Sequence, residues 1–475
     1  MGVVMVEPTA PLTEIIAALD SKQISAVEIL DAHLDRVERL DPQVNAVVTI
    51  EAERARTEAQ AIDDARANQQ PVGPLAGVPI TIKDALATEG IRSTGGATEL
   101  SDFVPDEDAT AVAKVRDAGA VVFGKTNVPR WSGDYQSYND MFGTTNNPWD
   151  LERTPGGSSG GPGASVAMGF TGFEIGTDIG GSVRVPSSFC GIYGHKPSFG
   201  VIPTYGYLDS VRFHRNVSDI NVFGPMARSI DDLDLLFDLL AGPNPDDAVG
   251  WQLALPAARS RDIGDFRVAA WLDDEFCPVD PSVNAVLESA VAALEAAGAH
   301  IDHDRRPDID PLAASVDGAN IIGLATDISD SDQFDAPDVD DRQGVMHRQW
   351  DVMHRQRGQL RQRWREFFTD VDVLLCPVTP VPAFKHVHSP EGSNWANSVL
   401  SDFGDMPYRH LLRWNTLTGS AYLPVTVPPI GRTADGLPVG VQVVAPYLHD
   451  FTALAFARCI SEVLGGFTPP PLAVS

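Results

Sequence analysis

Apolar residues recur along the chain with two different periods, and segments of the two kinds alternate. Apolar positions three and four residues apart predict amphipathic helices, whereas short apolar runs bounded by glycine predict buried strands. Helices are predicted over residues 12–20, 25–40, 42–67, 108–118, 161–168, 231–240, 283–297, 349–368 and 451–464. Strands are predicted over residues 78–82, 120–123, 171–176, 266–272, 371–375, 425–427 and 439–444. This alternation is typical of an α/β fold.

The pattern weakens in one stretch and is otherwise continuous. Residues 305–345 are rich in aspartate and poorly periodic, so we expect loops and short helices there, over the active site. No internal repeat and no long linker rich in glycine, serine or proline divides the 475 residues. We therefore predict one large domain, although length alone would allow about three at roughly 150 residues each.

Charge and composition exclude several classes of partner. The formal net charge of −30 repels phosphate backbones, so we expect no nucleic-acid partner. No apolar stretch approaches the length of a membrane span, and the first residues lack the features of a secretory signal. The four cysteines are far apart, without a CxxC pair or zinc-ligand spacing, which indicates reduced thiols in a cytoplasmic protein. They are Cys190, Cys277, Cys376 and Cys459.

The candidate chemistry lies in a lysine and two glycine-serine segments. The chain has only six lysines, and one of them, Lys83, ends the apolar run 77–84. Downstream follow the segments 154–161, which contains Ser158, and 176–184, which contains Ser182. A lysine and two serines held by glycine-rich backbone are suited to a hydrolase relay that needs no histidine.

The first glycine-serine segment allows two other interpretations. Gly157 to Gly161 matches G-x-S-x-G, the turn that presents a nucleophile in α/β-hydrolases, but a turn-rich loop precedes it where that turn needs a strand. A glycine-rich turn before a helix also binds phosphate. Here the loop lacks the G-K-[ST] ending and again does not follow a strand. We consider both interpretations weak.

The second segment is better placed for a nucleophile. Residues 171–176 predict a strand, and the turn that leaves it reaches Ser182 through two glycines. Glycines let successive N–H groups point into one cavity, which is what an oxyanion hole requires. Taken alone, the segment is more simply explained as a structural glycine turn.

The segments stand in the order found in the amidase signature family, which the chain resembles over most of its length. The blocks that carry the resemblance are 73–84, 124–129, 142–150, the two glycine-serine segments, 190–197 and 436–442. The resemblance implies an α/β fold with a central twisted mixed β-sheet flanked by helices on both faces. It also implies one amidase signature domain over residues 1–475, with a signature core at about 73–230 and a variable substrate-side region at about 245–420.

The same resemblance implies a Ser-cisSer-Lys triad of Ser182, Ser158 and Lys83, in which Ser158 follows a cis peptide bond. Burial at the end of an apolar strand lowers the pKa of a lysine, so that its neutral amine can act as a base. Ser158 then relays a proton from Ser182 to Lys83, and Ser182 forms an acyl-enzyme without metal or organic cofactor. The implied oxyanion donors are the N–H groups of Ile179, Gly180, Gly181 and Ser182. Residues implied to brace the loops by hydrogen bonds are Ser159, Asp178 and Arg184.

Substrate contacts are implied for the segment before the first serine loop. The residues concerned are Trp131, Ser132, Gly133, Asp134 and Tyr135. The aromatic rings of this segment either stack on an apolar substrate group or simply pack within the protein. Trp414 and Asn415 are expected to approach from the C-terminal side.

Two classes of function follow from the resemblance. The first is a stand-alone hydrolase, monomeric or homodimeric, that cleaves small apolar amides and also carbamates (urethanes) and esters. The alternative is the glutaminase subunit of an aminoacyl-tRNA amidotransferase, which has similar length and motifs. The residues after Gly124-Lys-Thr-Asn127 depart from the Met-Asp-Glu-Phe pattern usual in that subunit, which favours the first class. A catalytically dead relative is disfavoured because all three triad residues are present.

Overall fold

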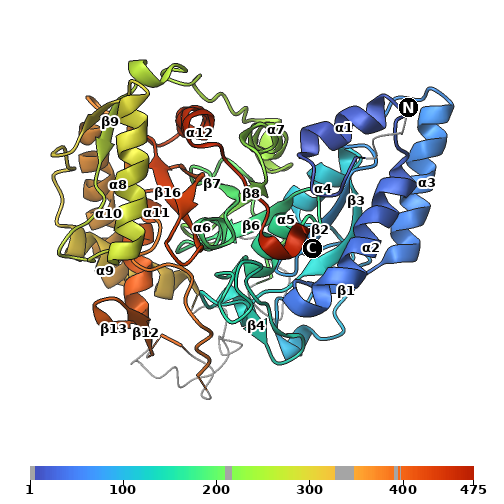
Figure 1. Ribbon diagram of the computed structural model, residues 1–475, viewed down its shortest axis with the longest axis horizontal. Helices are drawn as coiled ribbons and strands as arrows, with labels where there is room; N and C mark the ends of the chain where they lie inside the picture. The colour runs from blue at the N-terminus through green and yellow to red at the C-terminus, as the bar shows by residue number, and fades with distance from the viewer. Residues whose placement is uncertain (1–5, 209–216, 327–346, 390–393, 396, 475) are drawn as a thin grey trace.

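A mixed sheet of nine strands runs through the middle of the molecule (Figure 1). The computed structural model describes residues 6–208, 217–326, 347–389, 394–395 and 397–474. The strand order is β10-β9-β11-β16-β14-β7-β8-β6, and β15 pairs with β16 beside this path. The three strands β10, β9 and β11 are mutually parallel, whereas the pairs from β11 to β6 are antiparallel. The strands are β6 (Glu174–Asp178), β7 (Tyr193–Lys196), β8 (Val222–Ala227), β9 (Arg267–Ala270), β10 (His300–Asp302), β11 (Val373–Pro377), β14 (Val425–Val427), β15 (Pro429–Arg432) and β16 (Pro438–Val444).

A second, smaller sheet lies beside one edge of the large sheet. It contains β1 (Val47–Ile50), β3 (Val121–Thr126) and β2 (Pro79–Lys83) in that order, with β2 parallel to β3 and β1 antiparallel to it. Its strand β2 contacts β6, the edge strand of the large sheet. Two short hairpins complete the strands: β4 (Tyr138–Asn139) with β5 (Gly143–Thr144), and β12 (Ser398–Ser401) with β13 (Gly404–Pro407).

Helices cover both sheets. The N-terminal helices lie at one end of the molecule around the small sheet, and α8 to α11 lie at the other (Figure 1). The helices are α1 (Leu12–Asp20), α2 (Ala26–Val44), α3 (Ala52–Ala67), α4 (Thr110–Asp117), α5 (Gly160–Met168), α6 (Arg184–Cys190), α7 (Ile230–Leu240), α8 (Pro281–Ala296), α9 (Pro311–Thr326), α10 (His347–Phe367), α11 (Arg413–Gly419) and α12 (Asp450–Leu464). None of those in the described part of the chain is long and apolar enough to cross a membrane.

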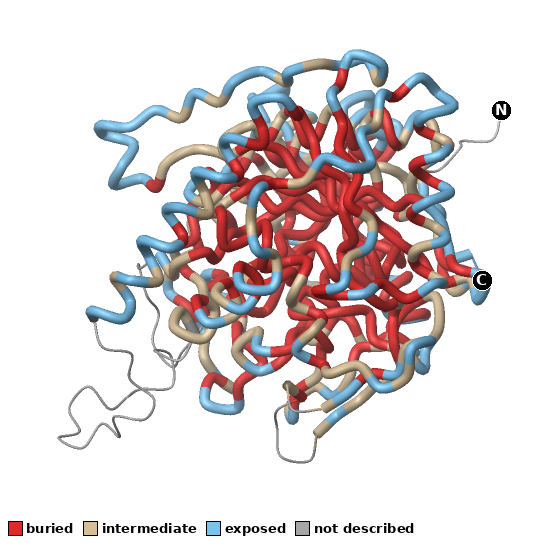
Figure 2. The backbone as a smooth tube through the Cα atoms, turned by 90° about the vertical axis from the view of Figure 1, so that its left-hand side faces the viewer, coloured by how far each residue is buried: buried red, intermediate tan, exposed pale blue. Residues whose placement is uncertain are grey.

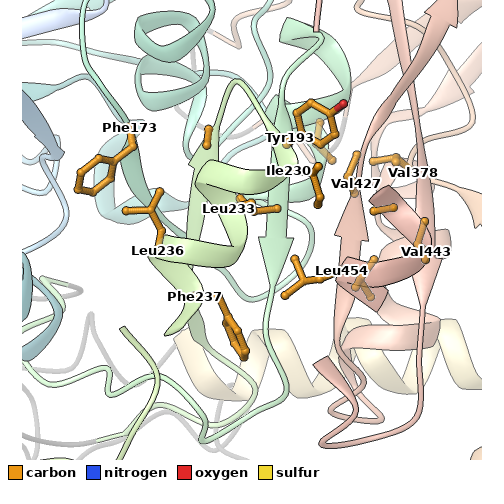
Figure 3. Close-up of a cluster of buried hydrophobic side chains, with 14 of the residues drawn as sticks. Phe173, Tyr193, Ile230, Leu233, Leu236, Phe237, Val378, Val427, Val443 and Leu454 are labelled. Carbon is orange, nitrogen blue, oxygen red and sulfur yellow. The ribbon is translucent and has the colours of Figure 1, made fainter. Parts of the chain in front are cut away.

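The core follows the periodicities of the sequence. In α7 the buried side chains recur at Ile230, Leu233, Leu236 and Phe237, a helical spacing that turns one face toward β8. Figure 3 shows these side chains beside Leu454 of α12 and the strand residues of the large sheet. Figure 2 shows that the buried residues fill the centre of the molecule and the exposed ones lie at its periphery. All four cysteines are buried and unpaired.

Two expectations about secondary structure were wrong. The predicted helix over 42–67 is broken: α2 ends at Val44, Asn45 takes a left-handed φ of 56°, and the β-branched run Val47–Ile50 forms β1 before α3 begins. Within 305–345, where only loops and short helices were expected, residues 311–326 form the 16-residue helix α9. The remainder of that stretch, from 327 to 345, lies outside the described residues.

Candidate active site

The two sheets are joined by a buried carboxyl group on β6. The Glu174 carboxyl accepts hydrogen bonds from the hydroxyl groups of Thr81 on β2, at 2.7 Å, and Thr126 on β3, at 2.9 Å. It also accepts the backbone N–H of Lys83 at 3.1 Å. Burial raises the pKa of Glu174 to about 8. These bonds fix the end of β2, and with it Lys83, against β6.

The amine of Lys83 is completely buried among hydroxyl groups. Its Nζ atom lies 2.7 Å from Ser158 Oγ, 2.9 Å from Ser159 Oγ and 2.7 Å from Thr177 Oγ1. Burial lowers the pKa of Lys83 well below its usual value, and the nearby acidic groups of Asp178 and Glu174 only partly oppose this. A neutral amine has two N–H donors and one lone pair. Three hydroxyl neighbours can therefore accept both N–H groups and donate to the lone pair.

Burial alone does not distinguish Lys83, because Lys125 and Lys196 are also fully buried. Burial lowers the pKa of Lys125 to about 8 and that of Lys196 to about 7. Lys125 binds the carbonyl of Leu86 and two hydroxyl groups, and Lys196 binds two backbone carbonyls. A carbonyl can only accept a hydrogen bond, whereas each neighbour of Lys83 can also donate one. Of these three lysines, Lys83 is the one whose side-chain hydrogen-bond partners among the described residues are all hydroxyl groups.

The loop that carries Ser158 packs tightly against its neighbours. The peptide bond between Gly157 and Ser158 is cis, as the resemblance implied. A methyl group built on Gly157 would lie 2.5 Å from the carbonyl oxygen of Asp134, so only glycine fits there. The backbone N–H of Ser159 donates to the carbonyl of Ser182 at 3.2 Å. This bond holds the first glycine-serine loop next to the second.

Ser182 follows a turn whose backbone is held by Asp178. The carboxylate of Asp178 accepts the N–H groups of Gly181 at 2.8 Å and Val183 at 3.1 Å. Gly181 has a φ of 126°, a conformation that favours glycine. Of the four N–H groups predicted to bind the oxyanion, that of Gly181 is thus occupied by Asp178. Those of Ile179, Gly180 and Ser182 have no acceptor among the described residues.

An ion pair beneath the turn locks Asp178 in place. Arg184 Nη2 lies 2.8 Å from Asp178 Oδ1, and both side chains are fully buried. Burial alone would raise the pKa of Asp178, but the charge and hydrogen bonds of Arg184 outweigh it and the net shift is downward. Arg184 Nη1 also binds the Asn415 carbonyl, the Thr418 hydroxyl and the Gln442 side chain, each at about 3 Å.

The predicted substrate segment splits into an outer and an inner part. The half-buried ring of Trp131 lies over Gly95, and the carbonyl of exposed Gly133 accepts a hydrogen bond from Trp395. The Ser132 hydroxyl is buried and has no partner among the described residues. Asp134 is buried, and burial raises its pKa to about 6. Tyr135 is also buried, and its hydroxyl donates to the carbonyl of Gly180.

Apolar side chains approach the Ser182 turn from the C-terminal half. A methyl group built on Gly180 would lie 2.9 Å from Leu412 Cδ2 and 3.0 Å from Ile322 Cδ1. Ile322 belongs to α9, so part of the 305–345 stretch does lie over the site. Of the two residues expected from this side, Asn415 reaches Gly181. Trp414 instead packs in the core among aromatic rings, and its indole N–H donates to the Cys277 carbonyl.

Several residues of the site were not singled out from the sequence. Thr177 and Gln442 both stand inside blocks that match the family pattern, so each could have been questioned for a role. No sequence signal separated Leu412 and Ile322 from ordinary core positions. Neither Asn394 nor Tyr408 is near a motif, yet both bind the Asp134 carboxylate.

Comparison with known proteins identifies the family. The amidase family model matches residues 28–336 and 337–454. The chain is 33% identical to one subunit of the glutamyl-tRNA(Gln) amidotransferase from Carboxydothermus hydrogenoformans, over 94% of this chain and 96% of that protein. Its fold resembles a bacterial aryl acylamidase of the amidase signature family, with a TM-score of 0.82, 25% identity and coverage of 96% of both chains. It also resembles 6-aminohexanoate cyclic dimer hydrolase, with a TM-score of 0.76, 26% identity and coverage of 98% and 100%.

The chain therefore belongs to the amidase signature family. It has the α/β fold of that family, with a central mixed sheet, and is a hydrolase that acts on C–N bonds. The similar proteins act on different substrates, so their names leave the substrate of this chain open.

Proposed function

We propose that the protein is a stand-alone hydrolase of small apolar amides, with Ser182 as nucleophile, Ser158 as proton relay and Lys83 as base. The observation that carries this proposal is the environment of the Lys83 amine. It is fully buried and lies 2.7–2.9 Å from three hydroxyl groups, one of them that of Ser158. Burial favours the neutral form of such an amine, and the lone pair of that form can accept a proton.

Each step in the proposed reaction is assigned to one named group. The Ser182 hydroxyl passes its proton to Ser158, whose own proton moves to Lys83, and the Ser182 oxygen attacks the amide carbon. The N–H groups of Ile179, Gly180 and Ser182 in the turn bind the oxyanion. The proton returns through Ser158 to the leaving amine as the C–N bond breaks. Water then repeats the sequence on the acyl-enzyme and releases the acid.

Apolar surroundings support the substrate class. Leu412 and Ile322 are the side chains nearest to the position that a Cβ atom would take on Gly180. Arg184, a cation close to the turn, is paired with Asp178 beneath it. A substrate with an apolar group beside its carbonyl would bury that group here favourably. Carbamates and esters present the same carbonyl and remain test substrates.

Glutaminase activity within an amidotransferase is the second candidate, favoured by the 33% identity to the subunit named above. Glutamine has an ammonium and a carboxylate group, and each needs a polar partner when removed from water. Leu412 and Ile322 offer no such partner. This difference supports the apolar amide as the substrate.

The test is amine release by the purified chain without ATP or a partner protein. The panel holds aryl amides, alkyl amides, an aryl carbamate, an ester and glutamine. Ser182→Ala is the inactive variant, and Ser165→Ala is the matched control because the buried Ser165 hydroxyl has no partner among the described residues. Turnover of apolar amides that is lost only in Ser182→Ala is the expected result. Turnover of glutamine alone would overturn the proposal.

A further inference from the structure

Tyr135 lies directly against the turn that precedes Ser182. Its side chain is only 2% exposed, and its hydroxyl donates to the backbone carbonyl of Gly180. A methyl group built on Gly181 would lie 2.8 Å from the Tyr135 hydroxyl oxygen and 2.7 Å from Cγ of Asn415. The hydroxyl and the amide therefore cover the side of Gly181 on which other residues carry a side chain.

The hydrogen bond from Tyr135 is one of two that hold the peptide unit between Gly180 and Gly181. The Gly180 carbonyl and the Gly181 N–H belong to the same peptide plane. The N–H donates to Asp178, and the carbonyl accepts from Tyr135. Glycines flank this plane on both sides, so few steric limits would otherwise hold its orientation. Two bonds on opposite edges of the plane set the direction of the neighbouring N–H groups of Gly180 and Ser182.

Tyr135 is itself held from outside the turn. Its ring packs edge-on against Trp395, with ring centres 5.7 Å apart. The preceding Asp134 accepts a hydrogen bond from Asn394 at 2.7 Å. The following Gln136 exchanges two hydrogen bonds with the backbone of Val387, at 2.6 and 2.9 Å. Tyr135 thus belongs to a segment fastened to a distant part of the chain, and its hydroxyl has a fixed position.

We propose that Tyr135 is a positioning residue: its hydroxyl holds the Gly180–Gly181 peptide so that the N–H groups of Gly180 and Ser182 point at the developing oxyanion. This inference rests on the proposed function, in which Ser182 is the nucleophile. Because the oxyanion forms only in the transition state, the bond contributes to kcat and not to substrate affinity. Loss of a direct oxyanion donor costs on the order of 10²–10³ in rate, and loss of this indirect support costs less, about tenfold.

Tyr135→Phe tests the proposal because it removes the hydroxyl and keeps the ring against Trp395. Two quantities are measured for the variant and the parent: kcat and KM on the best amide, and the inhibition constant of an aryl trifluoromethyl ketone, which forms a tetrahedral oxyanion adduct on a serine. We expect kcat to fall about tenfold, the ketone to bind about tenfold more weakly, and KM to stay within about twofold. Tyr193→Phe is the control, because Tyr193 is equally buried and its hydroxyl binds Ser461.

A raised KM with unchanged kcat would overturn the proposal and make Tyr135 a substrate contact. An unchanged kcat and unchanged ketone affinity would also overturn it. Should Tyr135→Phe fail to fold, Asn415→Ser removes the amide on the same side of Gly181 and is expected to lower kcat in the same way. Absence of amide turnover in the parent enzyme would refute the proposed function. The ratio of kcat in the variant to kcat in the parent tests the role of Tyr135 separately. If only glutamine is turned over, the same ratio is measured with glutamine.

Discussion

Thr177→Val tests how Lys83 is oriented. The neutral amine of Lys83 has two N–H groups and one lone pair, and its three neighbours are the hydroxyls of Ser158, Ser159 and Thr177. The lone pair faces Ser158 when Ser159 and Thr177 accept the two N–H groups. Valine has nearly the shape of threonine but cannot accept a hydrogen bond. The amine then makes one more hydrogen bond if it turns its lone pair toward residue 177 and donates to Ser158. In that orientation it cannot accept a proton from Ser158.

The size of the effect follows from the one hydrogen bond that distinguishes the two orientations. A net hydrogen bond in a protein is worth about 0.5–1.5 kcal/mol, so the productive orientation becomes less populated by a factor of roughly 2–12. We expect kcat/KM to fall by that factor. The change in unfolding temperature should be small, because no N–H group is left without an acceptor.

The assay is kcat/KM on a chromogenic anilide, together with the unfolding temperature. Thr177→Ser keeps the hydroxyl and should recover most of the activity. Thr426→Val is the matched control, because Thr426 is equally buried and its hydroxyl contacts His195, away from Lys83. Full activity of Thr177→Val, or an equal loss in Thr177→Ser, would refute the reasoning about the lone pair.

Three further predictions concern the same site. The base form of Lys83 is neutral, so activity is present above the pKa of Lys83 and lost below it. Because burial lowers that pKa, kcat/KM should level off well below pH 10.5. A tenfold rise of kcat/KM per pH unit up to pH 10 would contradict this. Asp178→Asn leaves the buried Arg184 unpaired and should lower the free energy of unfolding by about 3–5 kcal/mol in urea, whereas Asp370→Asn, in an exposed ion pair, should change it by less than about 1 kcal/mol. Equal effects would argue against a buried pair. Leu412→Ala should lower kcat/KM for amides with an apolar acyl group roughly 5- to 30-fold, which corresponds to about 1–2 kcal/mol of transition-state stabilisation. The kcat/KM for acetyl amides should stay nearly unchanged. Equal losses on both kinds of amide would show that Leu412 is not part of the binding surface.

Local periodicity was enough to locate most helices and the strands with continuous apolar runs. It did not reveal β1, because four strand residues are too few to interrupt an alanine-rich helical pattern in a sequence window. Nor did it reveal that β2 and β3 form a sheet of their own, since strand pairing depends on contacts between distant residues. The Glu174 hydrogen bonds that join this sheet to β6 are of that kind.

The proposed catalytic residues could be predicted because each stands in a glycine-rich motif with a characteristic order. Their surroundings could not. Leu412 and Ile322 come from helical regions more than 130 positions after Ser182, and nothing in their local sequence sets them apart. Tyr135 was predicted as a substrate contact, a role that stays untested, but its bond to Gly180 depends on the folded loop.

The most direct test of the central claim is the mass of the acyl-enzyme. The purified protein is mixed briefly with an activated aryl ester, quenched in acid, digested and mapped by mass spectrometry. The account predicts one acyl group on the peptide that contains Ser182, absent in Ser182→Ala and formed much more slowly in Lys83→Ala. An acyl group on another residue, or turnover that survives in Ser182→Ala, would contradict it.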